Sequence, residues 1–503
     1  MNLTPLARPF FYGRLKAIAK YATAAEAMQR NVLKHLISEA STTRWGIRHD
    51  YSAIHCYEQF AATVGVQDYE TLKAYIDRMR RGEKDVLWKG GCRWFAKSSG
   101  TTNDKSKFIP VTQDGLRNIH YKGGFDVVAT YVTANSGSRM FAGKAFVLAG
   151  SHSPNYNLPN SLVGDLSAIL IENCSPLVDF FRIPSKGIAL MGDFEEKMKR
   201  IAAAAFDKNV TNISGVPSWM MAVLKHMLDV TGKQSVDELW PNLEVFFHGG
   251  VAFTPYREQY RRLIRNSAMR YVETYNASEG FFALQDDPHD PAMLLMVDYD
   301  TFYEFMPVED VGSRAPRVVP LWDVEPGRNY AMLISNSCGL WRYMIGDTVR
   351  FTSREPYKIV ITGRTKHFIN AFGEELIVDN AERGLEQACN ETGARVLEYT
   401  AAPVFMDANA QCRHQWLVEF VVPPLSVEGF ATILDSALQR LNSDYEAKRY
   451  KNRTMQRLEL VVARENLFND WLKSKGKLGG QHKVPRLSNS RGYIEELLEM
   501  NEQ

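Results

Sequence analysis

Residues 97–110, KSSGTTNDKSKFIP, combine hydroxyl groups, one glycine and three lysines in a span suited to binding an anion. Gly100 lets the backbone approach a ligand closely, and backbone N–H groups in such a turn form a concavity that fits phosphate. The same composition also suits an ordinary surface turn. The Walker A pattern is absent, because the residue five after Gly100 is Lys105 rather than glycine. The hydroxyl donors around Gly100 are Ser98, Ser99, Thr101 and Thr102.

Three motifs in this order resemble the acyl-adenylate-forming superfamily of acyl-CoA synthetases and luciferases, and within it the GH3-type acyl acid amido synthetases. SSGTT is similar to the shared phosphate loop, YNASEG (275–280) to its Tyr-x-x-Thr/Ser-Glu motif, and YMIGD (343–347) to its Tyr-x-x-Gly-Asp motif. The CoA-ligase loop continues Gly-x-Pro-Lys, whereas here Asn103 replaces that glycine and Lys107 comes one position later, as in the GH3-like form. WPNLEVFFHGG, GVPSWM and QHKVPR also look GH3-like, so the resemblance covers most of the chain.

The resemblance implies Mg-ATP chemistry at a carboxylic acid, because a carboxylate is a poor acyl donor until it is joined to AMP. Glu279 would hold Mg²⁺, a hard cation that prefers carboxylate oxygen. Asp347 would accept hydrogen bonds from both ribose hydroxyls, although a turn aspartate is the alternative. Tyr275 would stack on adenine unless it is a core aromatic.

Other residues are assigned to the same nucleotide site by the resemblance. The hydroxyls of the loop would wrap the phosphates, with Lys107 as an added positive charge and Lys105 as its competitor. Gly249 and Gly250 resemble a turn that passes beside adenine, although paired glycines can equally mark a sharp strand exit. The resemblance also places Ser278 and Arg364 at the nucleotide.

A mobile lysine is expected near the end of the chain. GRTKHFINAFGEEL (363–376) is similar to the superfamily's hinge, about which the small domain rotates between adenylation and acyl transfer. Lys483, in GKLGGQHKVPR, resembles the lysine that reaches the α-phosphate and the carboxylate. The alternative is a solvated basic tail. That tail would consist of Lys473, Lys475, Lys477, Lys483 and Arg486.

The elements that must position these motifs indicate an α/β fold with two domains. Apolar residues from Tyr12 to about Met79 follow helical spacing, and later short strand-like runs alternate with helical segments. A strand-like run ends near Gly363, and the remainder reads as a small α+β unit with one long helix over 430–449. We therefore expect a large N-terminal α/β domain over 1–362, of the luciferase and acyl-CoA synthetase type, and a small mobile domain over 363–503.

Composition narrows the classes of partner. Sixty basic and 58 acidic side chains leave a formal charge of +2, which provides no field to gather nucleic acid or anionic membrane. The six scattered cysteines fit free thiols in a reducing compartment, so a cytoplasmic protein is expected. No apolar run reaches the 18 residues that span a bilayer. The basic start weakly resembles an organelle transit peptide, but an ordinary amphipathic helix looks the same.

The sequence therefore predicts a ligase that activates a small carboxylic acid as acyl-AMP and transfers the acyl group to an amino acid, releasing AMP and pyrophosphate. An acyl-CoA ligase and a nucleotide-binding sensor without turnover remain alternatives. His248, beside the paired glycines, and His367, near the hinge, are the histidines nearest to the site motifs in the sequence. Neither is assigned as a general base. The segment 215–227, with its apolar residues at helical spacing, would line an apolar acyl slot or belong to the core. Its candidate residues are Trp219, Met220, Val223 and Leu224.

Overall fold

The computed structural model describes residues 2–99, 106–251, 253, 256–313, 315–365, 368–405, 412–452, 455–475 and 484–502. The chain divides into two compact units. The first consists of Met1–Ser98 and Lys107–Thr365, and the second of Ser99–Ser106 and Lys366–Gln503. The boundary expected from the sequence, between residues 362 and 363, falls a few residues before this division.

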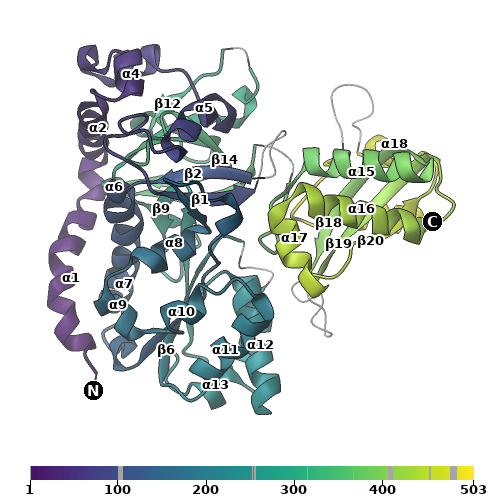
Figure 1. The fold of residues 1–503 in the computed structure, drawn as a ribbon, viewed down its shortest axis with the longest axis horizontal. Helices are drawn as coiled ribbons and strands as arrows, with labels where there is room; N and C mark the ends of the chain where they lie inside the picture. Colours follow the sequence, from purple (N-terminus) through teal and green to yellow (C-terminus); the bar gives the residue numbers. More distant parts are fainter. Residues whose placement is uncertain are drawn as a thin grey trace. The chain divides into compact units, whose positions relative to one another are not determined.

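The first unit opens with the expected layer of helices, led by α1 Thr4–Ala19 and α2 Tyr21–Ala40. Gln29, buried on α2, donates from Nε2 to the carbonyl oxygens of Val297 (2.9 Å) and Thr301 (3.0 Å). Its Oε1 accepts from the Tyr303 backbone N–H at 2.9 Å, so this buried amide is well satisfied and ties α2 to the sheet. Figure 1 shows α1 beside α7 Lys122–Ala134.

Further helices of the first unit surround its sheets. They are α3 Arg44–Arg48, α4 Tyr57–Thr63, α5 Tyr69–Arg80, α6 Gln113–Gly115, α8 Leu166–Asn173, α9 Pro176–Phe181, α10 Lys186–Ala189, α11 Phe194–Ala205, α12 Pro217–Thr231, α13 Val236–Leu239 and α14 Arg257–Leu263. Helix α5 begins at a complete cap, because the Asp68 side chain accepts from the Thr71 backbone N–H while Thr71 Oγ1 accepts from that of Asp68.

A twelve-stranded mixed sheet forms the core of this unit, in the order β12-β11-β13-β14-β15-β10-β9-β8-β7-β6-β3-β5. Neighbouring strands pair in parallel at one end of this order, from β5 through β3, β6 and β7 to β8. All further neighbours in the sheet order, from β8 and β9 to β11 and β12, pair antiparallel. The parallel part contains β3 Lys144–Val147, β5 Arg182–Ile183, β6 Val210–Gly215, β7 Val245–Gly249 and β8 Arg270–Ala277. The rest contains β9 Gly280–Leu284, β10 Met293–Leu295, β11 Thr301–Pro307, β12 Val319–Pro320, β13 Asn329–Asn336, β14 Tyr343–Arg354 and β15 Tyr357–Arg364.

A separate three-stranded sheet carries the two ends of the hydroxyl-rich loop. Its order is β2-β1-β4, with β1 Trp94–Ser99, β2 Ser106–Val111 and β4 Leu162–Gly164. The loop therefore leaves from the end of β1 and returns at the start of β2.

The second unit is an α+β layer structure, as the sequence predicts. Its three-stranded sheet consists of β18 Arg395–Val404, β19 Arg413–Val422 and β20 Glu459–Ala463. Figure 1 shows α15 Val378–Thr392 and α16 Val427–Leu441 side by side in this unit. Smaller elements are β16 Phe368–Ile369, β17 Leu376–Ile377, α17 Ser443–Arg449, α18 Leu467–Ser474 and α19 Gly492–Glu502.

The single long helix expected over 430–449 is two helices, because the chain becomes extended at Asn442. The side-chain oxygen of Asn442 accepts from the backbone N–H groups of Asp444 and Tyr445, both at 2.9 Å. This cap starts α17 in a new direction.

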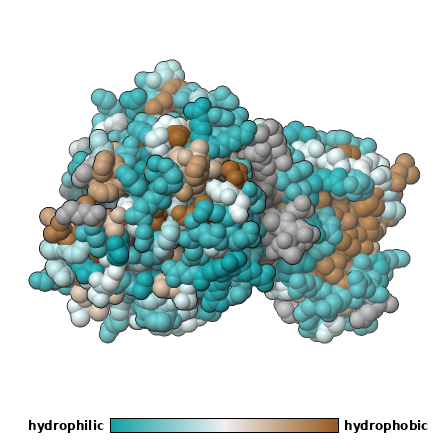
Figure 2. Space-filling model, turned by 90° about the horizontal axis from the view of Figure 1, so that it is seen from below, coloured by the Kyte–Doolittle hydropathy of each residue, from teal (hydrophilic) through white to brown (hydrophobic). Residues whose placement is uncertain are grey.

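All six cysteines are free thiols, of which Cys92, Cys338 and Cys412 are buried and Cys56 is exposed. Among the described residues, no helix combines the length and apolarity that a membrane span requires. Figure 2 shows apolar surface on one face of the second unit. Exposed large apolar side chains of this unit include Leu397, Val421, Leu425 and Val462.

Candidate nucleotide site

The hairpin of β8 and β9 positions the acidic motif. Ala277 pairs with Gly280, so Ser278 and Glu279 form a two-residue turn. Glu279 is only 7% exposed, and its backbone oxygen accepts from Asn336 Nδ2 at 2.8 Å. The turn that carries the carboxyl group is therefore held from a second strand, β13.

Tyr275 and Asp347 meet although their strands are not neighbours. Tyr275 Oη donates to Asp347 Oδ2 at 2.8 Å, while β15, β10 and β9 lie between β14 and β8 in the sheet order. Four strand spacings would separate the two strands by about 19 Å in a flat sheet, more than a tyrosine can reach. The sheet therefore curls, and this curvature unites the second and third motifs.

Arg364 is brought to the same place by strand register. Its backbone lies opposite Asp347 in the antiparallel pair of β14 and β15. Gly346, next to Asp347, has a φ of +94°, a backbone conformation that favours glycine, and its oxygen accepts from the Thr365 N–H at 2.8 Å. The register fixes the Arg364 backbone, while its side chain lies outside the described residues.

The paired glycines end β7 beside β8. Gly249 lies opposite Thr274, and a Cβ added at Gly249 would come within 2.4 Å of the Thr274 backbone oxygen. Gly250 has a φ of +84°. Both glycines are thus required by the close strand pairing and the turn, one residue away from Tyr275 in register. The carboxyl ends of parallel strands, where they lie, are the usual ligand edge of such sheets.

The hydroxyl-rich loop is described only at its ends. Ser98 lies on β1, and Lys107 is half-buried on β2, where its ammonium has no ion pair with any residue that the structure describes. The side chain of Ser99 lies outside the described residues, as do Gly100, Thr101, Thr102 and Lys105. Lys483 and His367 also lie outside them, so their assignments stay predictions.

Tyr275 has a second environment that bears on its assigned role. Its ring is 5% exposed and packs edge-to-face on Phe282, with ring centroids 5.0 Å apart. Its hydroxyl is the group that contacts another residue of the candidate site. Stacking of adenine on Tyr275 stays a prediction, and orientation of Asp347 is the role that the contacts favour.

His248 has a structural environment. The side chain is 3% exposed, and its ring stacks on Phe253 with centroids 4.0 Å apart. Burial, and to a smaller extent the positive charge of Arg257, lowers the pKa of His248 to about 3. Such a neutral, enclosed ring is a poor proton acceptor near neutral pH.

The expected helix over 215–227, observed as α12 Pro217–Thr231, contributes mostly to the core. Met220, Val223 and Leu224 are fully buried on α12, and Trp219 is half-buried beneath the Lys197 ammonium, 5.1 Å from its ring centroid. The expected apolar acyl slot therefore has at most Trp219 as a partly open wall among these four residues.

The donor set fits Mg²⁺ that arrives with a phosphate ligand. Among the described residues, no three His, Cys, Asp or Glu side chains are grouped as a closed metal cage. Mg²⁺ is usually held by one or two carboxylates together with substrate phosphates and water. One buried carboxyl group, Glu279, at the nucleotide motifs matches that arrangement.

Two residues that support the site were not predicted from the sequence. Asn336 holds the Glu279 turn, and Thr274 Oγ1 donates to the His248 backbone oxygen at 3.0 Å, linking β8 to the end of β7. Both act on backbone atoms of distant segments, and neither lies in a motif. Only Thr274 offered a signal, because it immediately precedes Tyr275.

Family profiles match most of the chain. The GH3 family N-terminal domain matches residues 14–269, which is more than half of the chain. The GH3 family central domain matches 294–364, and the GH3 family C-terminal domain matches 379–492.

Similar proteins of known name agree with this assignment. The indole-3-acetic acid-amido synthetase GH3.3 of Arabidopsis thaliana is 22% identical, covering 94% of this chain and 91% of its own length. The 4-substituted benzoates-glutamate ligase GH3.12 of the same plant is 22% identical, covering 94% of each chain.

Solved structures share the fold. The AtGH3.15 acyl acid amido synthetase in complex with 2,4-DB superposes with a TM-score of 0.61 at 17% identity, covering 97% of this chain and 95% of its own. A 2-hydroxyisobutyryl-CoA ligase gives a TM-score of 0.52 at 12% identity, covering 97% and 92%. The expected adenylate-forming fold, with a large N-terminal and a smaller C-terminal domain, is confirmed. This chain belongs to the GH3 family.

Proposed function

We propose that this chain is an ATP-dependent ligase that activates a small carboxylic acid as acyl-AMP and passes the acyl group to the amine of an amino acid. The observation that carries the proposal is the contact of Tyr275 with Asp347, which joins two distant motifs through a curled sheet, while Glu279 lies on the turn that ends the Tyr275 strand. Membership of the GH3 family, whose named members include amido synthetases and a benzoate-glutamate ligase, supports the same reaction.

In the first step a carboxylate oxygen of the acid attacks the α-phosphorus of ATP, and pyrophosphate leaves. Both reactants are anions, so preorganised positive charge is the main requirement of the site. Lys107 is available for this role on β2, and Lys483 is proposed as the lysine that contacts the α-phosphate and the carboxylate.

The nucleotide is held by the acidic residues and the loop. Asp347, oriented by the Tyr275 hydroxyl, would accept from the ribose hydroxyls, and Arg364 lies opposite it in register. Glu279 would hold the Mg²⁺, which neutralises phosphate charge when bound. The loop hydroxyls and the β7 turn at Gly249 would complete the pocket.

In the second step the amine nitrogen attacks the acyl carbon, AMP leaves with the electrons of the C–O bond, and the nitrogen loses a proton. The buried and weakly basic His248 is not the acceptor of that proton. The amine is deprotonated by solvent or by a substrate group in this scheme.

The test is acid-dependent release of pyrophosphate from ATP across a library of carboxylic acids that includes indole-3-acetate and 4-substituted benzoates. Mass spectrometry then identifies the product after addition of amino acids or CoA. Pyrophosphate with an amide product is expected. A thioester would assign the chain to acyl-CoA ligases, and ATP binding without pyrophosphate for any acid would make it a nucleotide-binding sensor.

Glu279→Gln tests the metal-binding role of Glu279, because the substitution keeps the shape of the side chain and removes its charge. Pyrophosphate release should fall about 100-fold, in line with the loss of one preorganised charge interaction. The control is Glu238→Gln at an exposed position of α13, which should leave the rate unchanged. Full activity of Glu279→Gln would remove Glu279 from the metal site.

A further inference from the structure

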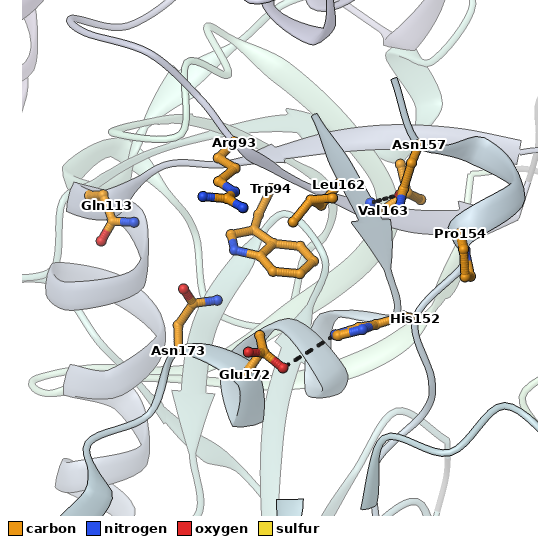
Figure 3. A pocket seen from close by; sticks show the side chains of 10 residues that line it. All are labelled: Arg93, Trp94, Gln113, His152, Pro154, Asn157, Leu162, Val163, Glu172 and Asn173. Carbon is orange, nitrogen blue, oxygen red and sulfur yellow. Dashed lines mark hydrogen bonds and ion pairs between the residues drawn. The ribbon is translucent and has the colours of Figure 1, made fainter. Parts of the chain in front are cut away.

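A polar cavity of about 480 Å³ lies beside the start of β1, in the first unit. Its size is within the range of small-molecule sites. None of its lining residues belongs to the nucleotide motifs, and Trp94 is five residues from Ser99 along β1, about 16 Å in an extended strand. Figure 3 shows Arg93, Gln113, Glu172 and Asn173 facing a common space next to the Trp94 ring.

The frame of the cavity is fixed by backbone pairing. Trp94 lies opposite Leu162 in the parallel pair of β1 and β4, and the Leu162 N–H donates to the Arg93 oxygen at 2.8 Å. The Val163 N–H donates to Asn157 Oδ1 at 2.8 Å, which fixes the loop on the other side (Figure 3). The cavity is therefore preformed, which reduces the entropic cost of binding a ligand.

The charge of the lining favours an anion. Glu172 is already paired, because Lys186 Nζ lies 2.9 Å from its Oε1. Arg93 is exposed, and its guanidinium has no hydrogen bond or ion pair with any residue in the described part of the chain. One positive charge in the lining is thus left without a partner among the residues that the structure describes.

A buried donor or acceptor also lacks a partner. His152 Nε2 is a buried atom without a hydrogen bond to the described residues, and it lies 3.9 Å from Glu172 Oε2, beyond hydrogen-bond distance. Buried polar atoms are nearly always satisfied, so this nitrogen is an exception in a residue of the lining. Asn173 donates its Nδ2 to the Ile169 oxygen at 2.8 Å, which orients its amide at the cavity.

Apolar side chains form another part of the lining. The Trp94 ring is buried to 6% exposure and lies 5.3 Å from the His152 ring, centroid to centroid. Leu162, Val163 and Pro154 continue this apolar part. A guanidinium fork next to an aromatic ring matches a carboxylate attached to a small apolar body.

We propose that this cavity is a second carboxylate site, separate from the nucleotide motifs, which binds a small apolar carboxylic acid with its carboxylate on Arg93 and its body on Trp94. A free acid and the carboxylate of an apolar amino acid share this chemistry. Binding here needs no ATP, so the proposal stands independently of the ligase reaction.

The test is isothermal titration calorimetry of the full chain without ATP, using benzoate and phenylalanine as probes and benzamide as the uncharged analogue of benzoate. Arg93→Gln should weaken binding of the occupying probe at least tenfold, and Arg93→Lys should weaken it less, because the charge is kept and the fork is lost. Arg139→Gln, at another exposed arginine of the same unit, should bind as the wild type does.

Binding of benzoate alone would identify a free acid as the occupant, and binding of phenylalanine alone would identify an amino acid. Benzamide should not bind. Three outcomes would overturn the proposal. The wild type and Arg93→Gln could bind both probes equally tightly, benzamide could bind as tightly as benzoate, or neither probe could bind. Benzoate that bound only at the ligase centre would bind to Arg93→Gln as tightly as to the wild type.

Pyrophosphate release by Arg93→Gln separates this proposal from the ligase proposal. A variant that loses ATP-independent probe binding and keeps pyrophosphate release supports two distinct sites. Absence of pyrophosphate release in the wild type would refute the ligase reaction and leave the Arg93-dependent binding result intact.

Discussion

At the residue scale, the contact between Tyr275 and Asp347 decides how the third motif presents its carboxylate. The Tyr275 hydroxyl occupies one lone pair of Asp347 Oδ2 at 2.8 Å. A carboxylate has about four acceptor positions, and the Tyr275 hydroxyl occupies one of them. Orientation by a buried tyrosine lowers the entropic cost of arranging the carboxylate when nucleotide binds.

Tyr275→Phe should weaken AMP binding by about tenfold, because a hydrogen bond to a charged group contributes about 1.5 kcal/mol or more. The ring and its packing on Phe282 are retained. Calorimetric titration with AMP measures the effect. The control is Tyr75→Phe on α5, which removes a hydroxyl that accepts a hydrogen bond from Arg48 Nη1 at 2.9 Å. This variant should bind AMP as the wild type does. An unchanged dissociation constant for Tyr275→Phe would remove the tyrosine from nucleotide binding.

Lys483→Ala is expected to separate chemistry from affinity. If this lysine contacts the α-phosphate and the carboxylate only during adenylation, pyrophosphate release should fall about 100-fold while the dissociation constant for ATP changes only a few-fold. Lys475→Ala is the control within the same basic segment. Equal losses in rate and affinity would make Lys483 an ordinary binding lysine. Full activity of Lys483→Ala would show that a neighbouring lysine of the basic segment acts in adenylation instead.

At the element scale, a buried lysine fastens helix α11 to the end of β3. Lys197 is 3% exposed, and its Nζ donates to the carbonyl oxygens of Ala149 (2.8 Å) and Gly150 (3.0 Å). Burial lowers its pKa to about 8, although the negative charge of Asp165 opposes this shift. The contact therefore depends on pH in the mildly alkaline range.

Lys197→Met should reveal that dependence. Below pH 8 the folded and unfolded chains both hold the proton, whereas between pH 8 and 10.5 only the unfolded chain does, so rising pH stabilises the folded wild type. The free energy of unfolding of the wild type relative to Lys197→Met should increase by about 1 to 2 kcal/mol from pH 7.5 to pH 9.5. Urea titrations of both proteins at the two pH values measure it. A constant difference would mean that Lys197 keeps an ordinary pKa.

At the scale of the whole molecule, each unit contains its own buried ion pair. In the first unit Arg342 Nη2 lies 2.9 Å from Glu304 Oε1, with both side chains buried. In the second unit Arg449 Nη2 lies 2.8 Å from Asp435 Oδ2, also buried. Arg342 donates further to the Ala61 oxygen at 2.9 Å and so joins the helical layer to β14. Loss of one partner would therefore leave a buried, unpaired charge in the unit that contains the pair.

Arg342→Met and Arg449→Met should each destabilise one unit by about 3 to 5 kcal/mol, because each leaves a buried carboxylate without its partner. Hydrogen exchange with mass spectrometry distinguishes the units. Arg342→Met should raise exchange in peptides from β11 and leave those from α16 unchanged, and Arg449→Met should do the reverse. Equal changes in both units from either variant would show that they unfold as one.

Much of the architecture could be predicted from local pattern. The opening helices and the α+β remainder follow from apolar spacing, because burial of one face is read at short range. The split of the predicted long helix at Asn442 was missed, since the periodicity continues through it and only the extended backbone and the Asn442 cap end it. The cavity beside Trp94 was also missed, because its walls come from five separate segments.

The sequence by itself determined the family, the motifs and the types of residue that can bind a nucleotide, since these reside in contiguous segments whose chemistry does not depend on distant parts of the chain. Only the tertiary structure decided that Tyr275 serves Asp347, that Asn336 holds the Glu279 turn and that Arg93 lines a cavity with no charged partner among the described residues. These relations depend on sheet curvature and strand order. Such features arise from the summed packing of many side chains, and no single segment encodes them.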